Sequence, residues 1–393
     1  MQVTSEPLPT TIDQPWDWWR AQMPISDQFA YFDHAAVGPL SLPAAQWVSK
    51  FAGQASQLGD TVWPSWNRNL KALRGSAAEL TGGDEKEFCI IPNTTTGINL
   101  VAEGWPWVAG DSVVIPDGEF PSNLFPWLNQ QSKGVEVRVV PRRSDREVQV
   151  DDLMDHVDET TKIIALSWVG YATGFRVDLD DLVRRAHDRG VAVFVDAIQG
   201  LGVYPLDLQK TPIDFLAADG HKWLLGPEGV GVAMIRRKHF DRLRPLNIGW
   251  ASVKESHNYS KPKMVLSDDA TRFESGSANM VGIGALAASM DLFVQIQNAH
   301  GPEAISDRVL SLASMLREKL IATGAVTAID ANPENQSGIV NFQVPGIEPA
   351  EFREEALNEN VVVSCRGTGV RAAIHAYNNE EDIDRLIAVV RSV

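Results

Sequence analysis

A carboxylate, an amide and a lysine with possible chemical roles occur in one part of the sequence. Asp196 closes the apolar run at residues 191–197, Gln199 follows it closely, and Lys222 lies further on, between a histidine and a tryptophan. A lysine is rarely buried unless it is paired or chemically used. Lys222 is therefore either a lysine of a surface loop or a covalent anchor. A desolvated lysine amine has a lowered pKa and forms a Schiff base with an aldehyde.

A threonine-rich turn supplies a candidate anion site. Residues 87–93 have the composition of a buried strand, and residues 94–105, which begin with Thr94, Thr95 and Thr96, read as a helix. The start of a helix offers backbone N–H groups and a positive dipole end to a phosphate. Taken alone, the three threonines would more often be just a helix cap.

These parts together match the requirements of pyridoxal phosphate (PLP). The threonine turn would hold the phosphate, Lys222 would bond to the aldehyde, and Asp196 would keep the pyridine nitrogen protonated so that the ring accepts electrons. An aromatic side chain must cover the ring, and the stretch GEFPSNLFPW offers Phe120. Phe120 could also be an ordinary core residue.

The elements that must position these residues alternate along the chain. Short runs rich in Val and Ile have the length and composition of buried strands, and a helical pattern with early acidic and late basic residues spans residues 178–190. Alternating strands and helices predict an α/β domain with a mostly parallel sheet, in which ligands bind beyond the carboxyl ends of the strands. The runs read as strands are residues 111–117, 135–141, 162–169, 191–197 and 229–237.

The character of the sequence changes near residue 285. Amphipathic helices are predicted at residues 284–297 and 306–324, followed by a strand at 337–344, a helix and strand within 351–365, and a last helix at 380–393. We therefore expect three parts: an N-terminal arm (1–30) that packs on the small domain or a partner, a large cofactor-binding domain (31–285) and a small α+β domain (286–393).

Composition excludes several classes of protein. The 393 residues are 44% hydrophobic, and 35 Lys+Arg against 51 Asp+Glu give a net charge of −16. Such an acidic surface disfavours nucleic acid and anionic membranes as partners. The two cysteines, Cys89 and Cys365, form no disulfide or zinc pattern, and the histidines lack metal-site spacing. With no signal peptide and no long apolar run, we expect a cytoplasmic protein without a metal.

Seven stretches, read together, carry a family resemblance. They are YFDHAAVGPL, NTTTGINLVAEG, GEFPSNLFPW, VFVDAIQGLGVYPLDL, DFLAADGHKWLLGPEGVG, RFESGSANM and YNNEEDIDRL, which extend over nearly the whole chain. They resemble the class V aminotransferase family of fold-type I PLP-dependent enzymes, which includes cysteine desulfurases, selenocysteine lyases and isopenicillin-N-epimerase-like proteins. The resemblance implies a large domain with a mostly parallel seven-stranded sheet, a smaller C-terminal α+β domain, and a homodimer.

The resemblance also implies roles for individual residues. Lys222 would form the Schiff base, Asp196 would pair with the pyridine nitrogen, and Gln199 would donate to the phenolic oxygen. The phosphate would be held by Thr95, Thr96 and His221, and the partner's phosphate by Ser277.

The substrate side is defined by fewer matches. Arg371 matches the arginine that holds the substrate carboxylate, although it could be a surface residue. Tyr171 lies near the family position that faces the cofactor and could instead be a packing residue. His34 lies in a loop that borders the substrate in the family, and a structural role is equally open to it.

Departures from the family guide the choice of reaction. Phe120 stands where cysteine desulfurases stack a histidine on the ring, and the loop before Arg371 lacks their nucleophilic cysteine. Asp219 replaces a phosphate-binding serine and, as a carboxylate, is expected to point away from the phosphate or to pair elsewhere. We therefore expect an aminotransferase-like or epimerase-like enzyme acting at the Cα of an amino acid, which the sequence does not name.

Three other functions stay open. They are a C–S lyase or cysteine-desulfurase-like activity, a PLP-binding regulatory protein with little turnover, and a nicotinamide dehydrogenase. The dehydrogenase is disfavoured because the GPEGVG stretch precedes a strand instead of following one.

Overall fold

The structure, a computed structural model, describes residues 15–142, 147–327 and 332–393. A central seven-stranded sheet has the order β2-β8-β7-β6-β5-β3-β4. All neighbouring pairs are parallel except those that β8 makes with β7 and β2. Its strands are β2 (Phe88–Ile91), β3 (Ser112–Pro116), β4 (Glu136–Val140), β5 (Thr161–Ser167), β6 (Ala192–Asp196), β7 (Phe215–Asp219) and β8 (Gly231–Ile235).

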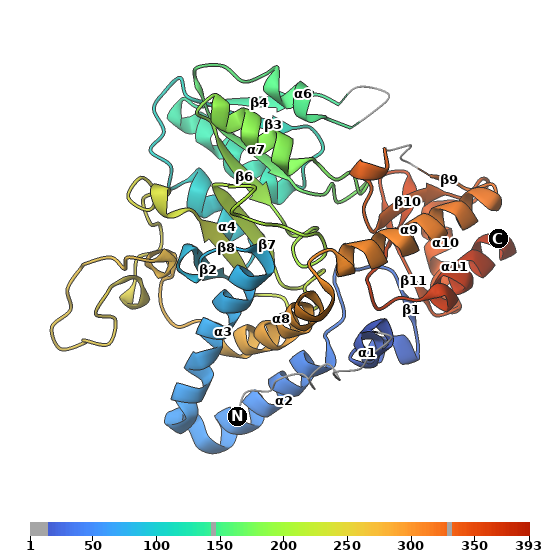
Figure 1. Ribbon diagram of the computed structural model, residues 1–393, viewed down its shortest axis with the longest axis horizontal. Helices are drawn as coiled ribbons and strands as arrows, with labels where there is room; N and C mark the ends of the chain where they lie inside the picture. The colour runs from blue at the N-terminus through green and yellow to red at the C-terminus, as the bar shows by residue number, and fades with distance from the viewer. Residues whose placement is uncertain (1–14, 143–146, 328–331) are drawn as a thin grey trace.

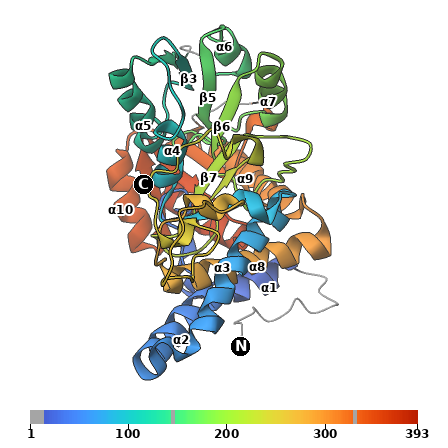
Figure 2. The same cartoon turned by 90° about the vertical axis from the view of Figure 1, so that its left-hand side faces the viewer.

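The inner strands are buried on both faces, which their near-continuous apolar sequences require. Along β6, Val193 and Val195 join one apolar cluster while Phe194 joins another, because successive side chains of a strand point to opposite faces. One face is covered by α4 (Thr94–Ala102), with α5 (Phe125–Leu128) beside it, and the other by α7 (Leu179–Asp188), as Figure 2 shows. The short α6 (Val150–Met154) contacts α7.

A long helix, α8 (Met280–His300), packs against α2 (Leu42–Leu58) and α3 (Trp63–Thr81) below the sheet (Figure 1). The contact with α2 is close, since a Cβ on Gly284 would lie 2.1 Å from the Trp47 ring. Among the described helices, α8 alone is long and apolar enough to cross a membrane, but 78% of its apolar window is buried inside the protein. Its composition is therefore that of a core helix.

The C-terminal part contains a four-stranded antiparallel sheet of order β12-β13-β10-β9. Its strands are β9 (Val326–Thr327), β10 (Ile339–Gln343), β12 (Ser364–Arg366) and β13 (Gly369–Ala373), and its helices are α9 (Ala304–Ala322), α10 (Pro349–Asn358) and α11 (Glu380–Ser392). The predicted α/β fold with a mostly parallel seven-stranded sheet is confirmed. The predicted domain boundary at residue 285 would fall inside α8.

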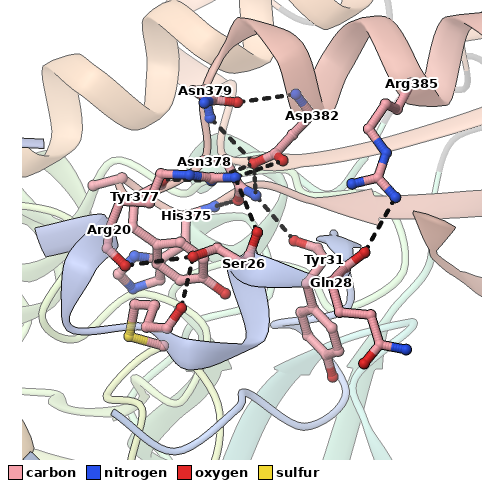
Figure 3. A network of polar contacts seen from close by, with 12 residues as sticks. Arg20, Ser26, Gln28, Tyr31, His375, Tyr377, Asn378, Asn379, Asp382 and Arg385 are labelled. Carbon is pink, nitrogen blue, oxygen red and sulfur yellow. Dashed lines mark hydrogen bonds and ion pairs between the residues drawn. The ribbon is translucent and has the colours of Figure 1, made fainter. Parts of the chain in front are cut away.

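The described part of the N-terminal arm contacts the C-terminal part. Strand β1 (Ala30–Tyr31) pairs in parallel with β11 (Val361–Val362), and α1 (Pro15–Ala21) places Arg20 2.8 Å from the Asp382 carboxylate (Figure 3). Asp382 also accepts a hydrogen bond from Asn378, whose amide donates to the Tyr31 carbonyl. The network joins the start of the described chain to the N-terminus of α11.

Candidate active site

A cavity of about 430 Å³ lies where the carboxyl ends of β5, β6 and β7 meet the loop at residues 35–37. The structure brings eight of the predicted site residues to its wall: Thr95, Phe120, Tyr171, Asp196, Gln199, His221, Lys222 and Arg371. A larger cavity of about 1000 Å³, which includes Asp178 and Asn335, holds none of them. We therefore take the smaller cavity as the candidate active site.

Lys222 is fixed by the tight turn that follows β7. Leu225 adopts a left-handed backbone (φ 56°), which is unusual for a residue with a side chain, and its N–H donates to the Lys222 carbonyl. Gly38 packs directly on this turn, since a Cβ there would lie 2.2 Å from the Lys222 carbonyl oxygen. Burial lowers the pKa of Lys222 to about 8. Its amine is therefore suited to act as a nucleophile or base near neutral pH.

Asp196 ends β6, paired in register with Ser167 of β5. Its side chain is buried, and burial raises its pKa to about 6 even though its Oδ1 accepts the Ile198 N–H at 3.1 Å. A carboxyl group with this pKa at the end of a strand is suited to share a proton with a nitrogen base that enters the cavity.

Gln199 connects the turn around Lys222 to the loop at residues 35–37. Its Nε2 donates to the Ala35 carbonyl at 3.0 Å, and its Oε1 accepts the Trp223 indole N–H at 2.7 Å. One N–H of the amide is left for the predicted contact with a cofactor oxygen. Its role toward the cofactor remains a prediction.

The predicted phosphate cradle lies at the N-terminus of α4. Asn93 caps the helix by accepting both the N–H and the hydroxyl of Thr96, and Thr96 does not reach the cavity. The Thr95 hydroxyl, in contrast, lies at the cavity and bonds to Ser122. The first N–H groups of a helix have no partner within the helix, so those of Thr94 and Thr95 can serve an anion.

Arg371 is a buried residue of β13, not a surface residue. Its Nε donates to Ser364, its Nη1 to the Tyr171 carbonyl, and its Nη2 lies 3.2 Å from the Asp33 carboxylate. Burial lowers its pKa to about 10, where it is still protonated at neutral pH. The guanidinium is therefore a preformed, desolvated site for a carboxylate.

Phe120 and Tyr171 form the aromatic wall. Their rings meet edge to face with centroids 5.2 Å apart, and the Lys222 amine lies 5.7 Å from the centroid of the Phe120 ring. Phe120 is 43% exposed, which leaves a face free to stack on a flat ring.

Besides Thr96, two predicted residues lie outside the cavity wall. His34 is fully buried, and its ring nitrogens are engaged by the Ala373 carbonyl and the Tyr377 hydroxyl. The structure thus gives His34 a packing role against Ala373 and Tyr377. Ser277 is exposed, and its assignment to a partner's site stays a prediction.

Several residues at or beside the cavity were not predicted from the sequence. Ser122, Ser167 and Arg366 line it, and partly buried Glu119 accepts both the N–H and the hydroxyl of Ser167. Burial raises the pKa of Glu119 to about 7. Ser122 and Glu119 lie in the stretch that supplied Phe120, so that motif was the available signal, whereas nothing in the sequence marks Ser167.

The cavity fits PLP. The Lys222 amine has a lowered pKa, Asp196 presents a carboxyl group, and the α4 terminus presents N–H groups. In addition, Asp219 Oδ1 and His221 Nδ1 are buried without a hydrogen-bond partner. Such orphaned groups are costly unless a ligand or solvent satisfies them.

This fold and this cavity define a fold-type I PLP-dependent enzyme. The chain belongs to the class-V aminotransferase family, whose profile, described as Aminotransferase class-V, matches residues 31–386.

Individual relatives agree with this membership. The chain is 30% identical to a probable cysteine desulfurase of Methanothermobacter thermautotrophicus, over 93% of this chain and 95% of the relative. It is 28% identical to a cysteine desulfurase of Yersinia pseudotuberculosis, over 83% and 82% of the two chains.

Solved structures show the same fold. The apo cysteine desulfurase of Thermococcus onnurineus NA1 matches with a TM-score of 0.85 at 24% identity, covering 99% of this chain and 98% of that one. The cystine C–S lyase C-DES, in complex with its product cysteine persulfide, matches with a TM-score of 0.87 at 22% identity, covering 94% and 99%. A mutant of C-DES carries glycine covalently linked to the PLP cofactor.

Proposed function

We propose that this PLP-dependent enzyme is a C–S lyase that breaks the Cβ–S bond of an amino acid bearing sulfur on Cβ, without a thiol of its own. The observation that carries the proposal is the cavity itself. It combines the base Lys222 and the carboxylate anchor Arg371, while neither cysteine is among the described residues that line it.

The choice of reaction follows the relatives. Their names describe cysteine desulfurases, and this favours C–S cleavage. From the sequence alone, C–S cleavage is the alternative to an aminotransferase-like or epimerase-like activity. The cavity supports labilising a bond to Cα without a protein thiol, and the names of the relatives favour the C–S bond among the possible ones.

Each residue has a defined task in this proposal. Arg371 binds the substrate carboxylate through its free N–H groups, and Phe120 and Tyr171 provide the apolar wall along which the side chain lies. Bound PLP supplies a conjugated ring that takes up the electron pair left at Cα. Asp196 holds the proton at the ring nitrogen, and Lys222 Nζ takes the proton from Cα.

The bonds and charges then balance without an oxidant. The electron pair released at Cα forms the Cα–Cβ double bond, and the Cβ–S bond breaks with its electrons on sulfur, which leaves as a thiol or persulfide after gaining a proton. Hydrolysis of the remaining three-carbon fragment gives pyruvate and ammonia.

The two thiols are poorly placed for the alternative in which the protein accepts the sulfur. Cys89 is fully buried in β2, and burial raises its pKa strongly. Cys365 donates to the Pro349 carbonyl at 3.2 Å, and burial raises its pKa as well. The nucleophile is the thiolate, which both environments disfavour.

Product analysis tests the proposal. The PLP-loaded protein, incubated with cysteine and separately with cystine, should yield pyruvate and ammonia in equal amounts. Alanine as the main three-carbon product would indicate a desulfurase, and a keto acid formed from amino acids without sulfur would indicate a transaminase.

We further propose a cytoplasmic homodimer with shared active sites. Its support is an exposed apolar segment that includes Ile248, Trp250, Tyr259 and Met264. This segment is joined to the Ser277 loop, because the Ala251 N–H donates to the Ser275 carbonyl. Sedimentation should give a dimer, and a stable PLP-loaded monomer would contradict the assignment of Ser277.

A further inference from the structure

Asp219 occupies an unexpected position in a phosphate site. It ends β7, its side chain is 6% exposed, and it lines the same cavity as Lys222. Its backbone N–H donates to the Thr94 hydroxyl at 2.9 Å, which places it against the N-terminus of α4. A carboxylate therefore lies beside the predicted phosphate cradle, where it would repel a phosphate dianion.

A histidine lies beside this carboxylate. His221 Nδ1 is 3.2 Å from Asp219 Oδ2, within ion-pair distance. The pair does not have hydrogen-bond geometry, and His221 Nδ1 and Asp219 Oδ1 are both buried without a partner. A small rotation of the imidazole would supply the missing bond, and Nε2 would then be free to face the cavity.

We propose that Asp219 and His221 act as one charged pair at the phosphate end of the cofactor site, in which Asp219 holds the imidazole as a cation and the other ring nitrogen donates to the phosphate. A carboxylate that accepts one ring N–H fixes the orientation of a histidine and increases its basicity. The imidazolium charge offsets the Asp219 charge, so the phosphate meets a neutral pair.

Binding of the phosphate then depends on pH. While His221 is protonated, the pair adds a charge-assisted hydrogen bond. Once His221 loses its proton, Asp219 is left with an uncompensated negative charge beside the phosphate, and the cofactor binds more weakly. Neutral Asn or Ser at position 219 removes this dependence.

The other charged groups at the cavity are Asp196 of β6, Lys222, Arg366, Arg371 and, in the turn before β8, Glu228. Asp219 already interacts electrostatically with Asp196 and Lys222. All of these groups are retained when only residue 219 changes, so a comparison of variants isolates Asp219. The inference concerns cofactor binding and is independent of which substrate bond is broken.

The experiment measures how much the phosphate contributes to binding. Dissociation constants of PLP and of pyridoxal, which lacks the phosphate, are determined by absorbance from about pH 7 to about pH 9.5, where the free phosphate is a dianion. The ratio of the pyridoxal constant to the PLP constant increases with the contribution of the phosphate, and it cancels the titration of Lys222. The proteins are the parent, Asp219→Asn, Asp219→Ser and His221→Gln.

In the parent, this ratio should fall by about tenfold or more as pH rises, the size of effect expected for the loss of one charge-assisted hydrogen bond. The ratio should stay level in the three variants. At the highest pH, the ratio should be larger in both residue-219 variants than in the parent. The phosphorus resonance of bound PLP should follow the histidine titration in the parent alone.

A ratio that falls in parallel in the parent and in Asp219→Asn would overturn the proposal, as would weaker binding in both residue-219 variants at every pH. The serine variant keeps the test valid if the asparagine variant unfolds, because serine is uncharged and smaller than aspartate. Failure of the C–S lyase proposal would leave these binding data unchanged.

Discussion

Arg371 Nη2 lies 3.2 Å from the carboxylate of Asp33, a residue 338 positions earlier in the chain. The same guanidinium donates to Ser364 and to the Tyr171 carbonyl. Three of its five N–H groups are therefore bound to the protein, which leaves one on each terminal nitrogen for a ligand. This arrangement holds the guanidinium in place before any substrate arrives.

Replacing Arg371 by lysine should impair substrate binding selectively. An ammonium cannot reproduce the planar fork, and the loss of a charge-assisted bond, about 3 kcal/mol, corresponds to roughly a hundredfold decrease in kcat/KM. The absorbance of bound PLP should not change. Arg391→Lys, an exposed change in α11, is the matched control. Equal kcat/KM in the parent and Arg371→Lys would contradict the anchor role.

Lys222 should be the residue that bonds to the cofactor, at a rate set by its pKa. The reactive form is the neutral amine, and burial lowers the pKa to about 8, so PLP uptake by the apoprotein should accelerate as pH rises through about 8 and then level off. Borohydride reduction followed by peptide mapping should find the label on Lys222. A label on another lysine would refute the assignment.

Asp196→Ala should retain PLP but lose most activity. Without the carboxyl group, the ring nitrogen loses its proton, and an effect of about 4 kcal/mol on the transition state gives roughly a thousandfold decrease in kcat. The absorbance spectrum reports retention of the cofactor, and product formation reports kcat. Turnover equal to that of the parent would show that Asp196 has another role.

Much of this site could be predicted because its residues lie next to strong local signals. Asp196 and Lys222 follow apolar runs, and the carboxyl ends of parallel strands meet at one edge of a sheet. The Asp33–Arg371 pair could not be predicted, because it joins a loop near the start of the described chain to β13, more than 300 residues later. The burial of His34 likewise depends on Tyr377 and Ala373, which are distant in sequence.

Competition among side chains to cap α4 explains why Thr96 does not line the cavity. The sequence offered three threonines and one asparagine at the start of α4, and the asparagine became the cap. Its side chain accepts both the N–H and the hydroxyl of Thr96, so this hydroxyl is engaged in the helix cap. Asparagine is among the best capping residues, so its choice as the cap follows from local chemistry. The family resemblance assigned Thr96 to the phosphate without considering this cap.

A second buried carboxylate stabilises the opposite end of β7. Asp214 accepts hydrogen bonds from His187 and His239 and pairs with Lys238. Burial alone would raise its pKa, but these contacts outweigh burial and hold the pKa well below its usual range.

Asp214→Asn should therefore lower the free energy of unfolding by about 3 to 5 kcal/mol at neutral pH, measured by urea denaturation. A depressed folded-state pKa stabilises the protein above the unfolded-state value, so the difference from the parent should shrink as pH falls below about 4. A difference that is independent of pH would rule out the charge as its cause.

The absence of a catalytic protein thiol is the central claim, and the double variant Cys89→Ala, Cys365→Ala tests it most directly. Parent and variant are loaded with PLP and given cysteine or cystine, and pyruvate, alanine and protein-bound persulfide are measured. The account predicts that both proteins form pyruvate at rates within about twofold of each other and that the parent carries no persulfide, because its thiols lie outside the cavity and are held protonated. Persulfide on Cys365 of the parent, together with loss of sulfur release in the variant, would contradict it.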